Sequence, residues 1–202
     1  FQLERVSQLR IELYAARHGE TVANLENRLC GKDTDSPLTQ EGVAQARLLG
    51  EGLKGIPFDK VYSSPLQRAV ATVKIAFGES RKICVDGRLA EIGLGVMDGL
   101  TYEEAAEKYP ASGMLFFSKP SSYKAPSGGE SIEAVMERVS SFLADLESQE
   151  GKTVFVQTHG YVLRVLYACT HGKSMAALDE SPHYANCDVT HYMYCSGKWE
   201  LQ

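Results

Sequence analysis

Short apolar segments alternate with amphipathic helical patterns along almost the whole chain, and this alternation is the strongest constraint on the fold. Runs rich in β-branched and aromatic residues predict strands at 11–16, 58–62, 82–85 and 153–157. Apolar residues at helical spacing predict helices over about 40–54, 66–77, 101–109, 131–146 and 161–170. Strands that alternate with helices favour an α/β fold with a largely parallel sheet.

Local signals mark where these elements begin and end. Helix starts are indicated by two N-cap residues and one capping box, at Thr39, at Ser131 and at Thr101 with Glu104. Pro65 suits the first turn of the helix over 66–77. The tail over 187–201 alternates around Ser196-Gly197 and predicts an edge strand or hairpin. We expect loops over 25–38 and 86–100, and an irregular excursion over 111–130.

Length and composition exclude several classes of protein. The chain has 202 residues, which suits one domain, and its net charge of -5 argues against a general nucleic-acid binder. No apolar run is long enough to predict a membrane span, so we expect neither nucleic acid nor a membrane as a partner. The polar first nine residues lack both a signal-peptide core and a Met, and we expect them to be a trimmed or added leader. The five cysteines are scattered singly, which favours reduced thiols and a cytoplasmic protein.

Three of the predicted strands end in residues that bind anions. The first ends at Arg17-His18-Gly19, the second leads through Ser63-Ser64-Pro65 to Arg68, and the fourth ends at Thr158-His159-Gly160. The carboxyl ends of parallel strands share one edge of the sheet, where ligands bind in α/β folds. Two arginines, two histidines and the starts of the following helices predict an anion site there, and a phosphoryl group fits such donors best.

Six motifs follow one another in a fixed order along the chain. They are Arg17-His18-Gly19-Glu20-Thr21 with Asn24; Arg28 with Gly31 and Asp35-Ser36-Pro37-Leu38-Thr39; Ser63-Ser64-Pro65-Leu66-Gln67-Arg68-Ala69 with Thr72; Leu89-Ala90-Glu91-Ile92 with Gly95 and Gly99; Gly129-Glu130-Ser131; and Thr158-His159-Gly160 with Arg164. In this order they resemble the histidine phosphatase superfamily, whose best-known branch is the cofactor-dependent phosphoglycerate mutases. The resemblance implies a phosphoglycerate mutase-like, three-layer α/β sandwich with a mostly parallel central sheet flanked by helices. It also implies a single domain over 1–202, with residues 92–127 inserted as a lid.

The resemblance implies a role for each residue that meets the phosphoryl group. His18 is the expected nucleophile and forms a phosphohistidine. His159, Arg17 and Arg68 are expected to hold the phosphoryl oxygens, and the two arginines to keep His18 neutral. Two further donors are expected, the side chain of Asn24 and the N–H of Gly160.

Glu91 is the expected general acid. It would protonate the leaving oxygen and later activate water, and a facing phosphate would raise its pKa. Glu20 and Glu130 are weaker candidates for this role. The remaining histidines, at 171, 183 and 191, are expected on the surface or at the rim. No group of His, Asp and Glu has metal-ligand spacing, so we expect neither a metal nor a cofactor.

The resulting hypothesis is a histidine acid-type phosphatase, a phosphoric monoester hydrolase acting on a small phosphorylated metabolite. A cofactor-dependent phosphoglycerate mutase remains the first alternative, although residues 111–127 carry only Lys119 and Lys124 as basic residues. A catalytically inactive module that binds a phosphorylated ligand is the second. The physiological substrate stays open, as does the oligomeric state, a homodimer included.

The chain departs from the family pattern at a few positions, which we expect to affect the substrate rim more than the phosphate pocket. They are Cys30, one extra residue between Gly31 and Asp35, Met97-Asp98, and Ala15-Ala16. The rim is expected from residues 92–127 and 171–186. Several apolar or aromatic side chains there have two interpretations. They contact an apolar or aromatic leaving group, or they only pack the lid: Met97, Met114, Phe116, Phe117 and Tyr123.

Overall fold

The computed structural model describes residues 10–149, 151–172 and 174–202, without the side chain of Met114. The expected leader over residues 1–9 therefore lies outside the described residues. In the described part of the chain, one six-stranded sheet has the order β3-β2-β4-β1-β5-β6. Its strands are β1 (Ile11–Arg17), β2 (Lys60–Ser63), β3 (Cys84–Val85), β4 (Thr153–Thr158), β5 (Val189–Cys195) and β6 (Lys198–Leu201).

The first four strands of that order are parallel, as the alternation of strands and helices predicts. β4 lies between β2 and β1, with Arg17 opposite Thr158 and Ser63 opposite Gln157. The polar residues that follow these strands therefore emerge at one edge. β5 and β6 form the expected antiparallel hairpin beside β1.

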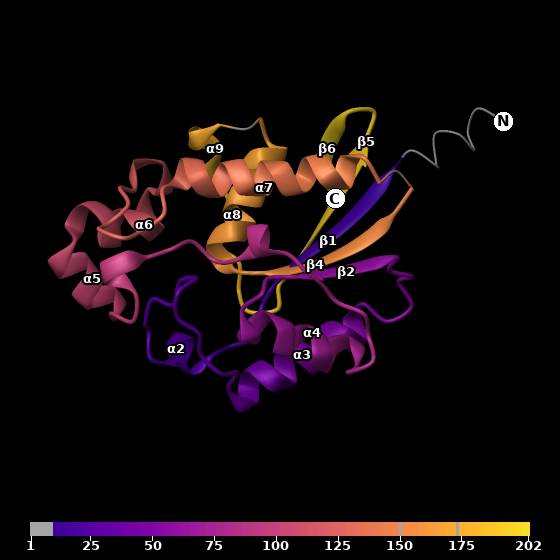
Figure 1. Ribbon diagram of the computed structural model, residues 1–202, viewed down its shortest axis with the longest axis horizontal. Helices are drawn as coiled ribbons and strands as arrows, with labels where there is room; N and C mark the ends of the chain where they lie inside the picture. Colours follow the sequence, from indigo (N-terminus) through magenta and orange to yellow (C-terminus); the bar gives the residue numbers. More distant parts are fainter. Residues whose placement is uncertain (1–9, 150, 173) are drawn as a thin grey trace.

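Helices cover both faces of the sheet (Figure 1). The larger ones are α3 (Gln40–Gly52), α4 (Gln67–Phe77), α7 (Ile132–Glu147) and α8 (Gly160–Thr170). α3 and α4 pack on one face, where Leu49 and Val73 join a cluster with Phe155. α7 and α8 pack on the other face, around Phe142 and Leu166. This alternation buries both sides of the central strands, so the three-layer sandwich is confirmed.

The capping residues begin the helices as expected. The side chains of Thr39 and Ser131 accept N–H groups of α3 and α7, and Thr101 with Glu104 forms the capping box of α5 (Tyr102–Lys108). Pro65 is the exception, because α4 begins at Gln67 with Leu66 as its N-cap. Pro65 thus precedes the helix and does not lie in its first turn.

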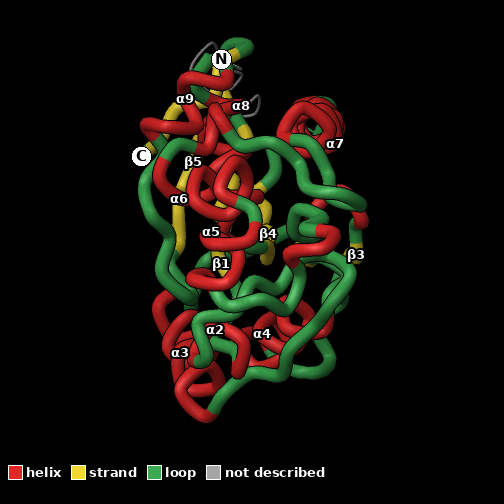
Figure 2. The backbone as a smooth tube through the Cα atoms, turned by 90° about the vertical axis from the view of Figure 1, so that its left-hand side faces the viewer, coloured by secondary structure: helices red, strands yellow, loops and turns green. Residues whose placement is uncertain are grey.

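Short helical segments lie between the larger elements, and several of them fall in regions expected to be loops or irregular. They are α2 (Val22–Leu25), α6 (Leu115–Ser118), α9 (Met175–Glu180), 3-10 turns at Gly87–Leu89, Gly95–Met97 and Pro120–Ser122, and a π-turn at Pro110–Met114. Figure 2 shows α2, α5 and α6 lying in front of the ends of β1 and β4. These segments enclose the edge where the polar strand ends meet.

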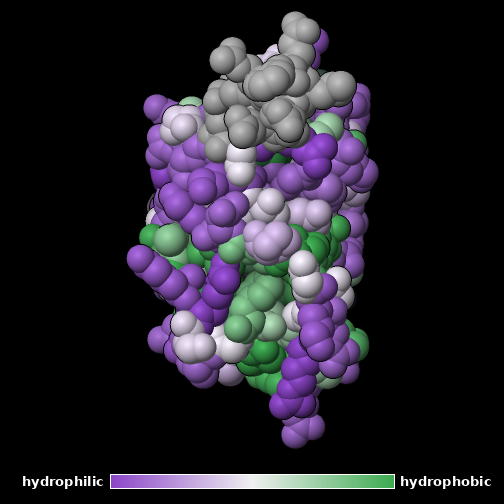
Figure 3. All heavy atoms as spheres, turned by 90° about the vertical axis from the view of Figure 1, so that its right-hand side faces the viewer, coloured by the Kyte–Doolittle hydropathy of each residue, from purple (hydrophilic) through white to green (hydrophobic). Residues whose placement is uncertain are grey.

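The opposite end of the molecule presents mostly hydrophilic side chains around a central hydrophobic area (Figure 3). None of the helices in the described ranges combines the length and the apolar character that a membrane crossing requires.

Candidate active site

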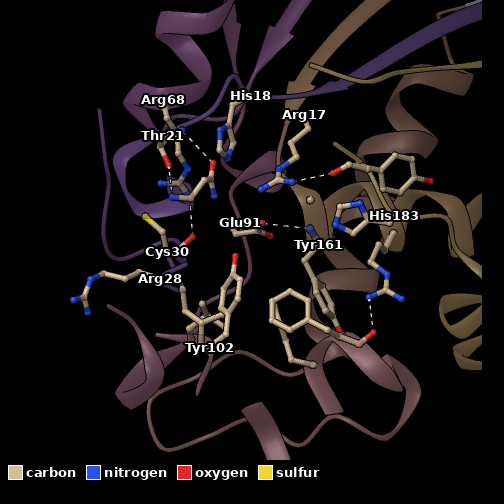
Figure 4. A pocket seen from close by; sticks show the side chains of 18 of the residues that line it. Arg17, His18, Thr21, Arg28, Cys30, Arg68, Glu91, Tyr102, Tyr161 and His183 are labelled. Carbon is tan, nitrogen blue, oxygen red and sulfur yellow. Dashed lines mark hydrogen bonds between the residues drawn. The ribbon is translucent and has the colours of Figure 1, made fainter. Parts of the chain in front are cut away.

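A cavity of about 440 Å³ opens at the carboxyl ends of the parallel strands. Six of the seven expected site residues line it: Arg17, His18, Asn24, Arg68, Glu91 and Gly160. The seventh, His159, is fully buried and lies behind His18, with 5.2 Å between the ring centroids. Figure 4 shows Arg17, His18, Arg68 and Glu91 around one common space.

His18 follows the last residue of β1, and its hydrogen bonds define its tautomer. Nδ1 lies 2.8 Å from the carbonyl oxygen of Gly19. Because a carbonyl only accepts, Nδ1 carries the proton and Nε2 keeps a free lone pair. Burial, reinforced by the charges of Arg68 and Arg17, holds the pKa of His18 well below its ordinary value of 6.5. His18 is therefore a neutral imidazole with an available nitrogen.

Gly19 allows the turn after His18 to pass close to α3. A Cβ at position 19 would lie 2.5 Å from the carbonyl oxygen of Gly42. The Gly19 N–H donates to Thr72 Oγ1 at 3.0 Å, which ties the turn to α4. A larger residue at position 19 would displace this turn and the adjacent His18.

His159 caps the start of α8 and faces a serine from the end of β2. Its Nε2 lies 2.7 Å from Ser64 Oγ. That oxygen already accepts the N–H of Leu66 at 3.3 Å, so its own proton can point to Nε2. Nδ1 of His159 then carries the proton. Burial, with the charges of Arg68, His18 and Arg17, holds the pKa of His159 well below 6.5.

Arg68 is 2% exposed, and the loop before α3 holds its guanidinium group. Nη1 donates to the carbonyl of Thr34 at 3.1 Å and to Asp35 Oδ1 at 3.0 Å. Nη2 donates to the carbonyls of Cys30 at 3.1 Å and Gly31 at 3.0 Å. These contacts leave only Nε of Arg68 for a ligand.

This loop contains two of the departures from the family pattern, at Cys30 and between Gly31 and Asp35. Its backbone carbonyls hold Arg68, and Cys30 also lines the cavity wall. Asp98, a third departure, accepts from the Gly31 N–H and from Thr34 Oγ1, each at 2.8 Å. Asp98 thus supports the loop that holds Arg68.

Three buried side-chain nitrogens have no partner among the described residues: Arg17 Nε, Arg68 Nε and His159 Nδ1. All three belong to residues expected to hold phosphoryl oxygens. Arg17 uses Nη1 for the carbonyl of Tyr184 at 2.9 Å, and burial is the main cause of its lowered pKa. Buried donors without acceptors cost free energy, so this arrangement suits an incoming anion.

Two further donors border the same space. The Oδ1 of Asn24 accepts the N–H of Thr21 at 3.2 Å, which leaves its Nδ2 toward the cavity that Asn24 lines. Gly160 is the first residue of α8, where N–H groups lack intrahelical acceptors. A Cβ at Gly160 would lie 3.6 Å from Arg17 Nε, so glycine keeps the approach to that donor open.

Glu91 is 9% exposed and faces the cavity from the loop after β3. Its Oε1 accepts the N–H of Ile92 at 2.9 Å, and its Oε2 accepts the N–H of Tyr161 at 3.3 Å (Figure 4). Burial raises the pKa of Glu91, although these hydrogen bonds and the charge of Arg68 oppose the shift. The group can therefore exist as a protonated acid nearer to neutral pH than an exposed glutamate.

The two weaker candidates for the acid lie away from the cavity wall. Glu20 Oε1 accepts from Thr39 Oγ1 at 2.7 Å at the start of α3. Glu130 pairs with Arg138 at 2.9 Å and accepts the N–H of Gly93 at 3.1 Å. Both carboxylates hold loops in place.

The outer part of the cavity is largely apolar, with a wall of Leu29, Leu94, Tyr102, Phe116, Phe117 and Tyr161. Phe116 stacks on Tyr161 with 4.4 Å between centroids and an angle of 14°. Phe117 is 47% exposed and lies 5.0 Å from the ring of Tyr102. Of the other side chains expected at the rim, Tyr123 packs behind Phe116 and Met97 is buried in the core. The side chain of Met114 lies outside the described residues.

The remaining histidines occupy different places. His183 lines the cavity mouth, whereas His171 stacks on Tyr167 at the surface. His191 contacts Glu12 on the sheet. Among residues 10–149, 151–172 and 174–202, no group of three or more His, Cys, Asp and Glu could hold a metal ion.

Sequence reasoning did not single out several residues near the site, although Tyr102, Tyr184 and Asn186 lie within the expected rim ranges 92–127 and 171–186. Tyr102, Tyr161 and Tyr184 line the cavity, and Asn186 contacts the backbone of His18. Tyr161 could have been found, because it directly follows His159-Gly160. No local pattern marks Asn186.

The chain is similar in sequence and in fold to several known proteins. The pattern of the histidine phosphatase superfamily (branch 1) matches residues 13–202. Phosphoglycerate mutase-like protein 4 of Arabidopsis thaliana is 36% identical over 160 residues, covering 77% of this chain and 69% of that protein. Phosphoserine phosphatase 1 of Hydrogenobacter thermophilus is 32% identical, covering 82% and 79%. The solved structure of Bacillus stearothermophilus YhfR has a TM-score of 0.86 and 34% identity, covering 95% of each chain.

Proposed function

The chain belongs to branch 1 of the histidine phosphatase superfamily, and from that premise we propose that it hydrolyses small phosphomonoesters through a phosphohistidine at His18. The observation that carries the proposal is the set of three unpartnered buried side-chain nitrogens around His18. A phosphoryl group supplies the oxygens that Arg17 Nε, Arg68 Nε and His159 Nδ1 lack.

In the first step, Nε2 of His18 attacks phosphorus and the bond to the leaving oxygen breaks. The protonated carboxyl of Glu91 gives its proton to that oxygen, so an alcohol departs. The buried donors stabilise the charge on the three transferred oxygens. The product is a phosphohistidine facing a carboxylate.

In the second step, water attacks the same phosphorus and gives a proton to Glu91. The bond between phosphorus and His18 breaks, and orthophosphate leaves. His18 returns to the neutral tautomer that its contact with Gly19 favours. No step uses a metal, so the proposal includes a metal-independent enzyme.

Hydrolysis is favoured over mutase activity by the lining of the outer cavity. A mutase needs a second anion site, whereas this wall is mainly aromatic and aliphatic. The cations there already have partners, because Arg28 pairs with Glu26 at 3.0 Å and Arg164 donates to Ser181 Oγ at 2.8 Å. The same wall favours substrates whose leaving group has an apolar part.

The test is to trap the intermediate. A rapid quench during turnover of a labelled phosphomonoester, with EDTA present, should leave an acid-labile, base-stable phosphoryl group on His18. His18→Ala should lose the label, while His171→Ala, a control at an exposed histidine, should keep it. Label on another residue, or activity that disappears in EDTA and returns with a divalent ion, would refute the mechanism.

A further inference from the structure

The loop that joins α9 to β5 approaches the end of β1 closely. The Cys187 N–H donates to the carbonyl of Arg17 at 3.0 Å. Cys187 has a φ of 62°, in the left-handed region that side chains seldom adopt. Asp188 Oδ2 accepts the N–H of Ala185 at 2.7 Å and closes the turn. This tight turn directs Asn186 toward the candidate site.

The side-chain amide of Asn186 makes two contacts that define its orientation. Nδ2 lies 2.9 Å from the carbonyl oxygen of His18 and 3.2 Å from Oδ1 of Asn24. A backbone carbonyl only accepts, so the nitrogen of Asn186 must face it. The same nitrogen requires that Asn24 offer its oxygen on this side.

A second donor imposes the same orientation on Asn24. The Thr21 N–H donates to Asn24 Oδ1 at 3.2 Å, as part of the capping box of α2. With both donors on Oδ1, Nδ2 of Asn24 is the atom left to the cavity. Nδ2 has no acceptor among the described residues.

We propose that Asn186 is a positioning residue that presents Nδ2 of Asn24, and the backbone of His18, to the phosphoryl group. The inference depends on the proposed function only in taking a phosphoryl group as the ligand. If the amide of Asn24 turned by 180°, its oxygen would face the phosphoryl oxygens and repel them. Asn186, together with the Thr21 N–H, opposes that rotation and at the same time holds the carbonyl of His18.

The test compares two variants of Asn186 by the affinity of orthophosphate, measured by titration calorimetry, and by kcat/KM for p-nitrophenyl phosphate. Asn186→Asp keeps the size but replaces the donor by an acceptor, which favours the reversed amide of Asn24. Losing one charge-assisted hydrogen bond should weaken orthophosphate binding by about 10- to 100-fold. Asn186→Ala removes the contact without favouring the reversed amide, so its loss should be smaller.

Two further comparisons separate positioning from a general structural effect. In an Asn24→Ala background, Asn186→Asp should cost less affinity than in the wild type, because no amide is left to orient. The defect of Asn186→Asp should also shrink, relative to wild type, as the pH falls and the introduced carboxyl regains a donor proton. Ala185→Asp adds the same charge at an exposed neighbour and should change affinity little.

The outcomes decide the matter in either direction. Equal losses for Asn186→Asp in both backgrounds, a larger loss for Asn186→Ala, or an equal loss for Ala185→Asp would overturn the inference. If Asn186→Asp does not fold, Asn186→Ser replaces it, and its hydroxyl donor should restore affinity relative to Asn186→Ala. Failure to hydrolyse any ester while orthophosphate binds normally would refute the proposed function alone. Failure of the wild type to bind orthophosphate would refute both.

Discussion

Glu91→Gln gives the sharpest test of the proposed acid, and the structure shows that this substitution has two separate effects. Both carboxylate oxygens of Glu91 accept backbone N–H groups, from Ile92 and from Tyr161. A glutamine has one oxygen and one NH₂ group, so one of these buried N–H groups would face a donor. The unmade hydrogen bond should lower the free energy of unfolding by about 1–3 kcal/mol.

The catalytic effect is distinct because it depends on the leaving group. An alkoxide needs a proton in the transition state, whereas p-nitrophenolate scarcely does. General acid catalysis is typically worth about 10²–10⁴-fold, so kcat/KM for n-propyl phosphate should fall by about that factor. At about 1.36 kcal/mol per factor of ten, this equals about 2.7–5.4 kcal/mol of transition-state stabilisation.

The assay measures kcat/KM for n-propyl phosphate and for p-nitrophenyl phosphate, together with urea unfolding of each variant. kcat/KM is the right quantity, because kcat can report the hydrolysis of phosphohistidine that both substrates share. Glu130→Gln is the matched control. Glu130 is also largely shielded from solvent, and it holds the same loop through Gly93 and Arg138 without lining the cavity.

The expected result is a large loss for the alkyl ester and a much smaller loss for the aryl ester in Glu91→Gln. Glu130→Gln should lose stability and affect both esters alike. Equal losses for the two esters in Glu91→Gln would show that Glu91 shapes the site without supplying the proton. Glu20 would then have to be tested as the acid, and the Glu130→Gln data on the two esters would already show whether Glu130 has that role.

Three other measurements test the site from different sides. Arg68→Ala should sharply reduce the rise in melting temperature that orthovanadate gives the wild type, because one of the buried donors is removed; full protection in the variant would contradict this. His18 and His159 have lowered pKa values when folded, so their contribution to stability is present above pH 6.5 and lost as the pH falls. Urea unfolding between pH 7.5 and 5.5 should therefore be less pH-dependent in His18→Gln, and an unchanged slope would be evidence against buried neutral histidines. kcat/KM for 3-phenylpropyl phosphate should exceed that for n-propyl phosphate by about tenfold or more. Phe117→Ser should reduce this ratio while Leu48→Ser, a control at an exposed residue distant in sequence, leaves it unchanged; a ratio near one in the wild type would argue against an apolar leaving-group wall.

The sheet and the polar strand ends that line the candidate site were predictable because their signals are local. His18, Arg68 and Gly160 each lie at or just after a strand, and parallel strands necessarily bring such residues to one edge. The N-caps Thr39 and Ser131 also act within one turn of themselves, so their position along the chain was sufficient.

The contacts that hold these site residues in place were not predictable from the sequence, for physical reasons. The loop that holds Arg68 uses the carbonyls of Cys30, Gly31 and Thr34, and a backbone carbonyl has no side-chain signature. α2 has four residues, too few for a helical period to be visible. Asn186 reaches the site from 168 positions away in the chain. Contacts of this kind follow from the assembled fold and not from any one segment.

The positions of Arg17 and Arg68 help to explain both the neutral state of His18 and the affinity expected for a phosphoryl group. Burial, reinforced by the charges of Arg68 and Arg17, lowers the pKa of His18, so the proposed nucleophile stays neutral without a separate base. Their Nε atoms have no acceptor among the residues that the structure describes, which is unfavourable in a buried site. A bound phosphoryl group relieves that cost, and the stabilisation grows as charge spreads over its oxygens during transfer. The positive charges of these two arginines disfavour a protonated His18 and stabilise a phosphoryl transition state. Removing either arginine should therefore raise the pKa of His18 and weaken phosphoryl binding at the same time.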